Sequence, residues 1–471
     1  MRLLGGLAAF VVAVTVLPGA SARSHDAASD ALIHADATRA AGYTGTGVTV
    51  AIVDTGIDEH NPDLADSIVA EHCFVPPDGC PNGAAEQDGP GSAQDDQGHG
   101  TAVAGLITGN GGTAPAGVAP DASLVVVKVT DRNGRTSSAQ IIAGLNWILD
   151  NHPEVRAINV SLAGDILLSG TCDNVSQNLK PYATVIDTLR ARGTMVFAPT
   201  GNSGSRFSIP APACFHSTVA VGAVYARSFG SYTVPLVCSD PTTAANQVAC
   251  FSNSSAELDL LAPGAPIETT ALGGGLFNFA GTSAASAEAV GAAAVLLQAD
   301  PSLTPDQVEA ALQETGVPVT DPRTHVTTPR LDVAAALSSV LGKPIPLLPT
   351  PLSNAPTTPP TLGQPTVPVA TLALRPIAFG SVRLGSRTSK TLVVRNTGTG
   401  FLTVRIGSLT APFTSRPAKL VIPQGGLARV TLTFRPTRAT TYSRPLKLAT
   451  DDPTAASITI PLSGRGKRRA G

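Results

Sequence analysis

Short apolar runs alternate with segments of helical spacing through roughly the first two thirds of the chain. The strand-like runs occupy residues 48–53, 123–129, 157–162 and 194–198. Between them, Ile142, Leu145 and Leu149 fall on one face of a helix that we predict over 139–149. Alternating strands and helices predict a parallel sheet with helices on both faces. Reactive groups gather where the strands of such sheets end, and Asp54 directly follows the first run.

Two further helices and then a change of composition follow. Cap and stop signals predict a helix over 301–316, and an amphipathic pattern predicts a last one over 331–341. Nine prolines then occur between Pro344 and Pro368. Because such a stretch stays extended, we expect residues 343–370 to be a linker between two domains.

Beyond the linker the pattern changes to short strands in which apolar and polar residues alternate. The clearest runs are 391–395, 402–406 and 428–434, separated by turn signals at 396–398, 424–426 and 451–453. Roughly seven strands without a cysteine predict an all-β immunoglobulin-like sandwich over 371–471.

Charge is divided unevenly between these two parts. The chain has a formal net charge of −2, but residues 370–471 hold 17 Lys and Arg against two acidic residues, which gives this segment +15 and the remainder −17. A basic domain beside an acidic body predicts attraction to a polyanion, or docking of one domain on the other. The alternative is a spacer or solubility module with scattered arginines.

The N-terminus has the pattern of a secretory signal. Arg2 precedes an apolar run at 3–17, and the Ala-Ser-Ala at 20–22 resembles a cleavage site, so we predict a signal peptide over 1–22. The alternative is a membrane anchor, for which the run is short. We therefore expect a secreted or cell-surface protein, with no transmembrane segment after signal removal and a short lead at 23–41.

The six cysteines are consistent with export into an oxidising compartment. Six cysteines allow 15 connectivities, and the sequence alone does not choose among them. Our prediction pairs neighbours along the chain, namely Cys73 with Cys80, Cys172 with Cys214, and Cys238 with Cys250. A metal site or a catalytic thiol is the weaker alternative, because no Cys-x-x-Cys pair is present.

Three short motifs carry candidate chemistry. VDTGID contains Asp54, QGHGTAVAG contains His99, and AGTSAASA places Ser283 at the start of a predicted helix of small residues over 284–297. These are the parts of a nucleophilic triad, in which the hydroxyl attacks a carbonyl, the imidazole takes its proton and the carboxylate orients the imidazole. Each motif alone also fits a plain turn, a surface histidine or an N-cap.

In this order along the chain, the motifs resemble the subtilisin-like serine proteases, peptidase family S8, over about residues 41–341. The resemblance implies an α/β fold with a parallel sheet and helices on both faces, and a catalytic domain over 42–342. It also implies a secreted serine endopeptidase that hydrolyses peptide bonds through an acyl-enzyme, with Asp54, His99 and Ser283 as catalytic residues.

The same resemblance assigns the surroundings of the triad. Asn202, in the motif Thr-Gly-Asn-Ser-Gly, matches the asparagine of the family's oxyanion hole. Backbone pairing with a substrate peptide suits a protease of broad specificity, and we expect a preference for apolar residues before the cleaved bond. The implied substrate-binding residues are Ser161, Leu162, Ala163, Thr200 and Gly201.

The sequence departs from the family in two respects. Ala102, Ala284, Ala287 and Glu288 stand where His, Met, Pro and His are usual. Many relatives also carry an inhibitory pro-domain at the position of the lead. We expect either that this protease folds without such a helper or that the lead does a smaller version of that work.

We expect the triad mechanism implied by the resemblance to require no cofactor. Family members often bind structural calcium, but we assign no metal ligands, and we expect Asp95 and Asp96 to lie in a solvated loop. The expected partners are protein or peptide substrates and an anionic cell-surface polymer at the C-terminal domain, with no specific nucleic acid.

The alternative function is a catalytically weak scaffold that binds surfaces through its basic domain. That domain itself resembles the Ig-like modules of bacterial surface proteins known as choice-of-anchor D and HYDIN-like domains. The segments that carry this resemblance are 377–382, 395–398, 434–436 and 451–453.

Overall fold

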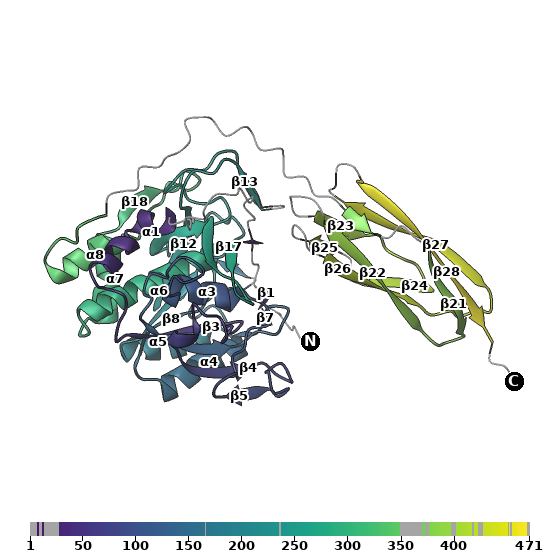
Figure 1. The fold of residues 1–471 in the computed structure, drawn as a ribbon, viewed down its shortest axis with the longest axis horizontal. Helices are drawn as coiled ribbons and strands as arrows, with labels where there is room; N and C mark the ends of the chain where they lie inside the picture. The colour runs from purple at the N-terminus through teal and green to yellow at the C-terminus, as the bar shows by residue number, and fades with distance from the viewer. Residues whose placement is uncertain are drawn as a thin grey trace. The chain divides into compact units, whose positions relative to one another are not determined.

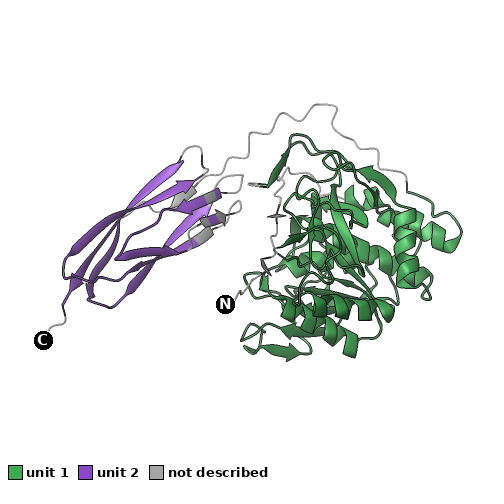
Figure 2. Cartoon of the chain, turned by 180° about the vertical axis from the view of Figure 1, so that it is seen from behind, with its two compact units in different colours: residues 1–352 green, residues 353–471 purple. Residues whose placement is uncertain are grey.

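Two compact units divide the chain, residues 1–352 and residues 353–471 (Figures 1 and 2). The computed structural model describes residues 7–8, 12–13, 28–164, 166–234, 237–348, 370–372, 376–396, 402–416, 419–422, 427–450, 452 and 455–468. Most of the predicted signal and of the predicted linker therefore lies outside the described residues. Within the described part, no helix is both long and apolar enough to cross a membrane.

A ten-stranded sheet forms the centre of the first unit, in the order β18-β19-β15-β12-β10-β8-β3-β6-β4-β5. All neighbours from β19 to β4 are parallel, and only the edge strands β18 and β5 run antiparallel, which confirms the predicted parallel sheet. Its strands are β3 (Thr49–Asp54), β4 (Ile68–Phe74), β5 (Glu86–Asp88), β6 (Ser123–Lys128), β8 (Val155–Asn159), β10 (Met195–Pro199), β12 (Thr218–Tyr225), β15 (Leu260–Ala265), β18 (Val317–Thr320) and β19 (Thr327–Arg330).

Helices cover both faces of this sheet (Figure 1). Along β3, Val50 and Ile52 belong to the core shared with α3 and α6, whereas Ala51 and Val53 belong to the core shared with α4 and α5. This alternation explains the continuous apolar run, because both faces of a central parallel strand are buried. The helices are α1 (Ala28–Ile33), α2 (Ala35–Ala40), α3 (His99–Thr108), α4 (Ser138–Asn151), α5 (Lys180–Ala191), α6 (Thr282–Ala299), α7 (Pro305–Glu314) and α8 (Val333–Leu341), with a 3₁₀ turn at Ala65–Ser67.

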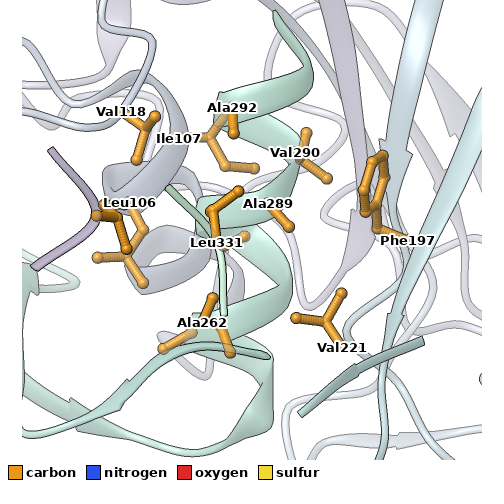
Figure 3. Close-up of a cluster of buried hydrophobic side chains, with 14 of the residues drawn as sticks. Leu106, Ile107, Val118, Phe197, Val221, Ala262, Ala289, Val290, Ala292 and Leu331 are labelled. Carbon is orange, nitrogen blue, oxygen red and sulfur yellow. The ribbon is translucent and has the colours of Figure 1, made fainter. Parts of the chain in front are cut away.

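Helix α6 is buried along most of its length. Its side chains are mostly alanine, so that its backbone comes close to the sheet and to α3. Figure 3 shows Val290 of this helix beside Phe197 of the sheet, with Ile107 of α3 close to Ala292. The small-residue pattern predicted for 284–297 therefore corresponds to a central helix packed at short distance.

The order of the strands places the candidate chemistry at one edge of the sheet. From β3 the chain first builds β4 and β6 on one side, and then returns to build β8, β10, β12 and β15 on the other. Ligands of such sheets bind in the crevice beyond the carboxyl ends of the strands, where the direction of building reverses. Asp54 and Asn159 end the two strands that flank this point.

The lead at 23–41 contributes two helices to the first unit. Ile33 is completely buried in the main core. The hydroxyl of Ser29 donates to Oε1 of Glu288 on α6, and Arg330 donates from Nη1 to the carbonyl of Leu32 at 2.7 Å. Nδ1 of His34 lies 3.0 Å from Oδ2 of Asp332. The described part of the lead is thus packed into the core of the first unit.

The three disulfides have the predicted pairing: Cys73–Cys80, Cys172–Cys214 and Cys238–Cys250. Cys73 lies in β4 and Cys238 in β14, and the other four cysteines lie in turns or loops. Short ladders complete the unit, formed by β1 (Leu7–Ala8) with β7 (Arg135–Thr136), β2 (Val12–Ala13) with β17 (Leu276–Ala280) and β16 (Ile267–Thr270), β9 (Leu167–Leu168) with β11 (Ile209–Pro210), and β13 (Tyr232–Val234) with β14 (Cys238–Asp240).

The second unit is a β-sandwich whose described residues form a four-stranded and a five-stranded sheet, in the orders β20-β22-β26-β24 and β21-β28-β27-β23-β25. Its core stacks Phe413 on Phe434, with ring centroids 4.8 Å apart. More strands are present than the seven expected, and the predicted turns fall almost wholly outside the described residues. The strands are β20 (Ala370–Leu372), β21 (Ile377–Arg383), β22 (Thr388–Asn396), β23 (Leu402–Ile406), β24 (Phe413–Arg416), β25 (Lys419–Ile422), β26 (Leu427–Phe434), β27 (Thr441–Thr450) and β28 (Ser457–Lys467).

The buried Glu288 generates a prediction about stability. Burial raises the pKa of Glu288 well above its ordinary value of 4.5, and the hydrogen bond from Ser29 only partly opposes this effect. The folded protein therefore keeps a proton that the unfolded chain releases, so this residue makes the free energy of unfolding fall as the pH rises above 4.5. The variant Glu288→Gln should lose this part of the pH dependence, as measured by urea unfolding from about pH 5 to about pH 8.

These measurements use a Ser283→Ala background to prevent any self-cleavage. Glu314→Gln is the matched control, because Glu314 is exposed at the end of α7. If the pH slope of Glu288→Gln equals that of the parent and of the control, the argument from burial is wrong.

Candidate active site

Asp54, His99 and Ser283 lie at the ends of three different elements of the first unit. Asp54 is the last residue of β3, His99 is the first residue of α3, and Ser283 is the second residue of α6. Because α3 and α6 pack against each other on the same face of the sheet, their N-terminal ends share the edge to which β3 leads. The fold thus brings together three motifs that are far apart in the sequence.

Asp54 and His99 form a buried pair. Nδ1 of His99 lies 2.7 Å from Oδ1 of Asp54, and the two residues are 3% and 0% exposed. The same carboxylate oxygen accepts a hydrogen bond from the amide of Thr55 at 2.7 Å. Phe279 packs edge-on against the imidazole, with ring centroids 5.4 Å apart. The ring is therefore fixed on one nitrogen, and Nε2 is left as the reactive nitrogen.

The environment of His99 has opposing effects on its pKa. Burial lowers the pKa, whereas the charge and the hydrogen bond of Asp54, together with the charge of Asp95, raise it. The net result is a pKa above the ordinary 6.5. A raised pKa makes the imidazole a better proton acceptor, as a general base requires.

Two glycines allow the histidine helix to approach the aspartate turn. A Cβ on Gly100 would lie 2.0 Å from the carbonyl oxygen of Gly56, and a Cβ on Gly56 would lie 2.1 Å from the carbonyl oxygen of Ala93. Gly56 also has a φ of +110°, which side chains rarely allow. The amide of Gly100 donates to the hydroxyl of Thr55 at 2.8 Å. Glycine at both positions is therefore a condition for the 2.7 Å contact.

The prediction of a solvated loop at Asp95 is wrong. Asp95 is only 4% exposed, and its carboxylate accepts hydrogen bonds from the amides of Gln97 and Gly98 and from both the amide and the hydroxyl of Thr101, at 2.7–3.1 Å. Burial raises the pKa of Asp95, but these hydrogen bonds lower it by more, so that the pKa lies below the ordinary value. Asp95 thus anchors the first turn of α3 and holds the backbone of His99 in place.

Asp96 makes a contact that the sequence argument missed. The ammonium of Lys128, a residue 1% exposed at the end of β6, lies 2.7 Å from Asp96 and donates to the carbonyl of Thr55 at 2.8 Å. Lys128 is paired in register with Asp54. A lysine at the end of an otherwise apolar run was the available signal, because a buried charge requires a partner.

Ser283 is held by a short polar network beneath it. Asn159 donates from Nδ2 to the hydroxyl of Ser161 at 2.7 Å, and its Oδ1 accepts a bond from Ser286 at 2.6 Å. The hydroxyl of Ser161 in turn donates to the carbonyl of Ser283 at 3.4 Å. Among the described residues, Oγ of Ser283 makes no hydrogen bond. Catalytic hydrogen bonds are often loose before substrate binds, so its bond to His99 belongs to the functional proposal.

Asn202 is oriented by the residue that precedes Ser283. Its Oδ1 accepts hydrogen bonds from both the amide and the hydroxyl of Thr282, each at 2.9 Å. The hydroxyl of Thr282 also accepts from the amide of Gly201 at 3.1 Å. With Oδ1 held, the amide group of Asn202 is the free donor end. The amides of Thr282 and Ala284 already donate, to Asn202 and to the carbonyl of Gly281, so that the amide of Ser283 is the donor left over at the start of α6 within the described residues.

The two segments implied in substrate binding flank this site. Residues 161–163 follow β8 without belonging to a strand, and Leu162 is buried while Ala163 is half-buried. On the other side, Thr200 is buried, and its carbonyl accepts a bond from Asn253 at 2.8 Å.

The residues present do not point to a calcium site. No group of three or more His, Cys, Asp and Glu in the described ranges is arranged to hold a metal ion. Asp95 commits both carboxylate oxygens to its own loop, and Asp63 does the same with the amides of Thr113 and Ala114.

Gly100→Ala tests the close approach of the two backbones. The added methyl has no room against Gly56, so α3 should move and His99 should leave its position beside Asp54. A displacement of about 1 Å can cost about 10² in rate, and we expect a loss of that order in kcat with a smaller change in KM. Gly42→Ala is the control, since nothing lies within 4 Å of its added Cβ; its φ of +88° adds a backbone strain that the helical Gly100 does not have, so the control is the stricter one. Equal kinetics for the two variants would contradict this reading.

Comparison with known proteins gives a family match for each of the two units. The model of the subtilase family matches residues 45–335, and that of the HYDIN/CFA65/VesB-like, Ig-like domain matches residues 370–465. Subtilisin E of Bacillus subtilis (strain 168) is 37% identical over 287 residues, covering 60% of this chain and 64% of its own length. Subtilisin of Bacillus pumilus is likewise 37% identical over 287 residues, covering 60% of this chain and 88% of its own length.

Among solved structures, a protease from Pseudoalteromonas arctica PAMC 21717 superposes with a TM-score of 0.52 and 26% identity, covering 64% of this chain and 93% of that one. The chain thus spans a little under two thirds of the length of subtilisin E. Since the subtilase model matches more than half of the residues, together with the fold and the paired Asp54 and His99, the chain belongs to the subtilase family.

Proposed function

We propose that the chain is a secreted serine endopeptidase with Asp54, His99 and Ser283 as its catalytic triad. The observation that carries the proposal is the buried 2.7 Å contact between Asp54 and His99 at the edge from which α6 presents Ser283. Three disulfides and the signal-like N-terminus support export. The named relatives are subtilisins, and their family supports the same chemistry.

In the proposed reaction, Oγ of Ser283 attacks the carbonyl carbon of the peptide bond while Nε2 of His99 takes its proton. Asp54 keeps the imidazole in the tautomer with its proton on Nδ1 and stabilises the imidazolium. The oxyanion accepts hydrogen bonds from the side-chain amide of Asn202 and from the amide of Ser283. His99 then returns the proton to the leaving amine, and water hydrolyses the acyl-enzyme by the same steps.

The enzyme is tested by active-site labelling. A fluorophosphonate probe should label the purified protein at Ser283, and Ser283→Ala should abolish the labelling together with hydrolysis of a peptide substrate. Ser302→Ala is the control and should keep both labelling and hydrolysis, because Ser302 is exposed and its side chain bonds only to Asp300. Labelling of Ser283→Ala at the level of the parent would exclude this mechanism.

Asn202→Ala should lower kcat by about 10²–10³, the size of effect known from the corresponding donor in subtilisin, and should change KM little. The reason is that the donor acts on charge that develops only in the transition state. Steady-state kinetics on a chromogenic peptide measures both constants. A rise in KM with unchanged kcat would instead place Asn202 in substrate binding.

For the second unit we propose attachment to an anionic polymer at the cell surface. The supporting observation is that its described Lys and Arg side chains are all exposed, whereas Asp452 is only 1% exposed. An outer surface with one sign of charge attracts polyanions over about a Debye length. The relation to Ig-like modules is compatible with this role but supplies no ligand.

Retention of the full chain on dextran sulfate tests this second proposal. Lys447, Arg465 and Lys467 are exposed on β27 and β28, and their replacement by Gln should lower the salt concentration needed for elution. A matched control replaces three exposed cations of the first unit, Arg132, Arg135 and Lys180, by Gln. Elution that is insensitive to salt, or that shifts equally in both variants, would contradict attachment through the second unit.

A further inference from the structure

A cavity of about 670 Å³ lies at the β5 edge of the main sheet, lined by none of the residues of the candidate active site. It is bounded by β4, β5 and the C-terminal end of α4. The residues that give it chemical character are Glu59, Glu71, Glu86, Asp88, Trp147 and His152. Its volume is in the range of ligand pockets of proteins.

The lining is strongly acidic. Four carboxylates line the cavity, while no Lys or Arg is among its lining residues. Glu86 and Asp88 each contact the buried ring of His72, at 3.3 and 2.8 Å, but their side chains are 62% and 71% exposed. The C-terminal end of α4 adds the negative end of a helix dipole. The site therefore favours a cation.

Glu71 gives a second and independent sign of a missing partner. The residue is only 6% exposed, and its Oε2 accepts a hydrogen bond from the amide of Gly91 at 2.9 Å. Its Oε1 is buried and has no hydrogen-bond partner within the described part of the chain. A buried acceptor without a donor is costly, and the cost disappears when a ligand supplies an N–H. Burial and the nearby Glu59 raise the pKa of Glu71, and the backbone amides of Gly91 and Ala93 oppose them only in part.

The adjoining strand β4 has a free main-chain edge. β5 pairs with β4 only from His72 to Phe74, so residues 68–70 have no strand on this side within the described ranges. Val69 is 57% exposed there. An exposed edge of this kind can accept an extended peptide as an added strand, and the adjoining pocket then selects its side chains.

We propose that this cavity is a docking site for an extended protein segment that carries Lys or Arg. The main chain of the segment pairs with residues 68–70, and a cationic side chain enters the cavity, where its N–H groups reach Glu71 and the carboxylates of the rim. A metal ion is the poorer occupant, because no three suitable ligands converge in the described residues. The site goes beyond the proposed protease chemistry and does not depend on it.

The test measures binding by the full chain carrying Ser283→Ala, which removes cleavage from the result. The probe is a fluorescent peptide in which Lys and Thr alternate, followed by anisotropy. Glu71→Gln should raise its Kd about tenfold, and so should the rim variant Glu86→Gln/Asp88→Asn, in line with the loss of a hydrogen bond to a charged group. Acetylation of every lysine, or N-methylation of the peptide backbone, should abolish binding.

Asp150→Asn is the matched control, since Asp150 is an exposed acid on the same helix α4 and does not line the cavity. It should leave Kd within twofold. The proposal is overturned if Asp150→Asn weakens binding as much as the cavity variants, if neither cavity variant weakens it, or if the acetylated peptide binds equally well. Fluorophosphonate labelling of Glu71→Gln with Ser283 intact checks that the fold is kept, and the rim variant carries the test where Glu71→Gln does not fold.

Discussion

The contact between Asp54 and His99 depends on two backbones that approach to the limit set by their glycines. Gly100 on α3 faces the carbonyl of Gly56, and Gly56 faces that of Ala93, in each case with no room for a side chain. This approach brings the start of α3 over the end of β3. Asp95 and Lys128 then fix the surrounding loop through buried hydrogen bonds. The backbone packing therefore sets the positions of Asp54 and His99, and the buried charges of Asp95 and Lys128 stabilise those positions.

The nucleophile is positioned by the same physical means on the other side. Helix α6 is rich in alanine, and its short side chains let it lie against both α3 and the sheet (Figure 3). Glu288 interrupts this apolar helix five residues after Ser283, and its partner Ser29 comes from the lead. The described part of the lead thus fills a polar gap in the core. This gives the lead a structural role in the fold, whereas the sequence left open whether the protein folds without a helper or the lead does a smaller version of that work.

The pattern of the sequence was sufficient for the main elements because each is marked locally. Continuous apolar runs marked the two-sided strands, and spacing marked α4 and α7, the latter with a complete capping box at Thr304 and Gln307. The burial of Asp95 was not predictable in this way, because its hydrogen-bond donors become available only when α3 begins at His99. Lys128 and the open edge of β4 depend on strand order, which no local pattern contains. The missed features are thus those that arise from tertiary contacts.

The candidate active site and the cavity at the β5 edge differ in how strongly each can select the side chains of a bound peptide. At the candidate active site, the pairing proposed for an extended substrate uses main-chain groups of residues 161–163, and pairing of this kind is nearly indifferent to side chains. At the β5 edge, by contrast, a buried carboxylate of Glu71 lacks a donor and is surrounded by others of the same charge. Protonation satisfies the Glu71 carboxylate but removes its negative charge. A cationic side chain donates N–H groups to the carboxylate while Glu71 and the neighbouring carboxylates stay charged. Selection by charge is therefore physically separable from cleavage in this fold, because the two sites lie on different strands of one rigid sheet and share no lining residue.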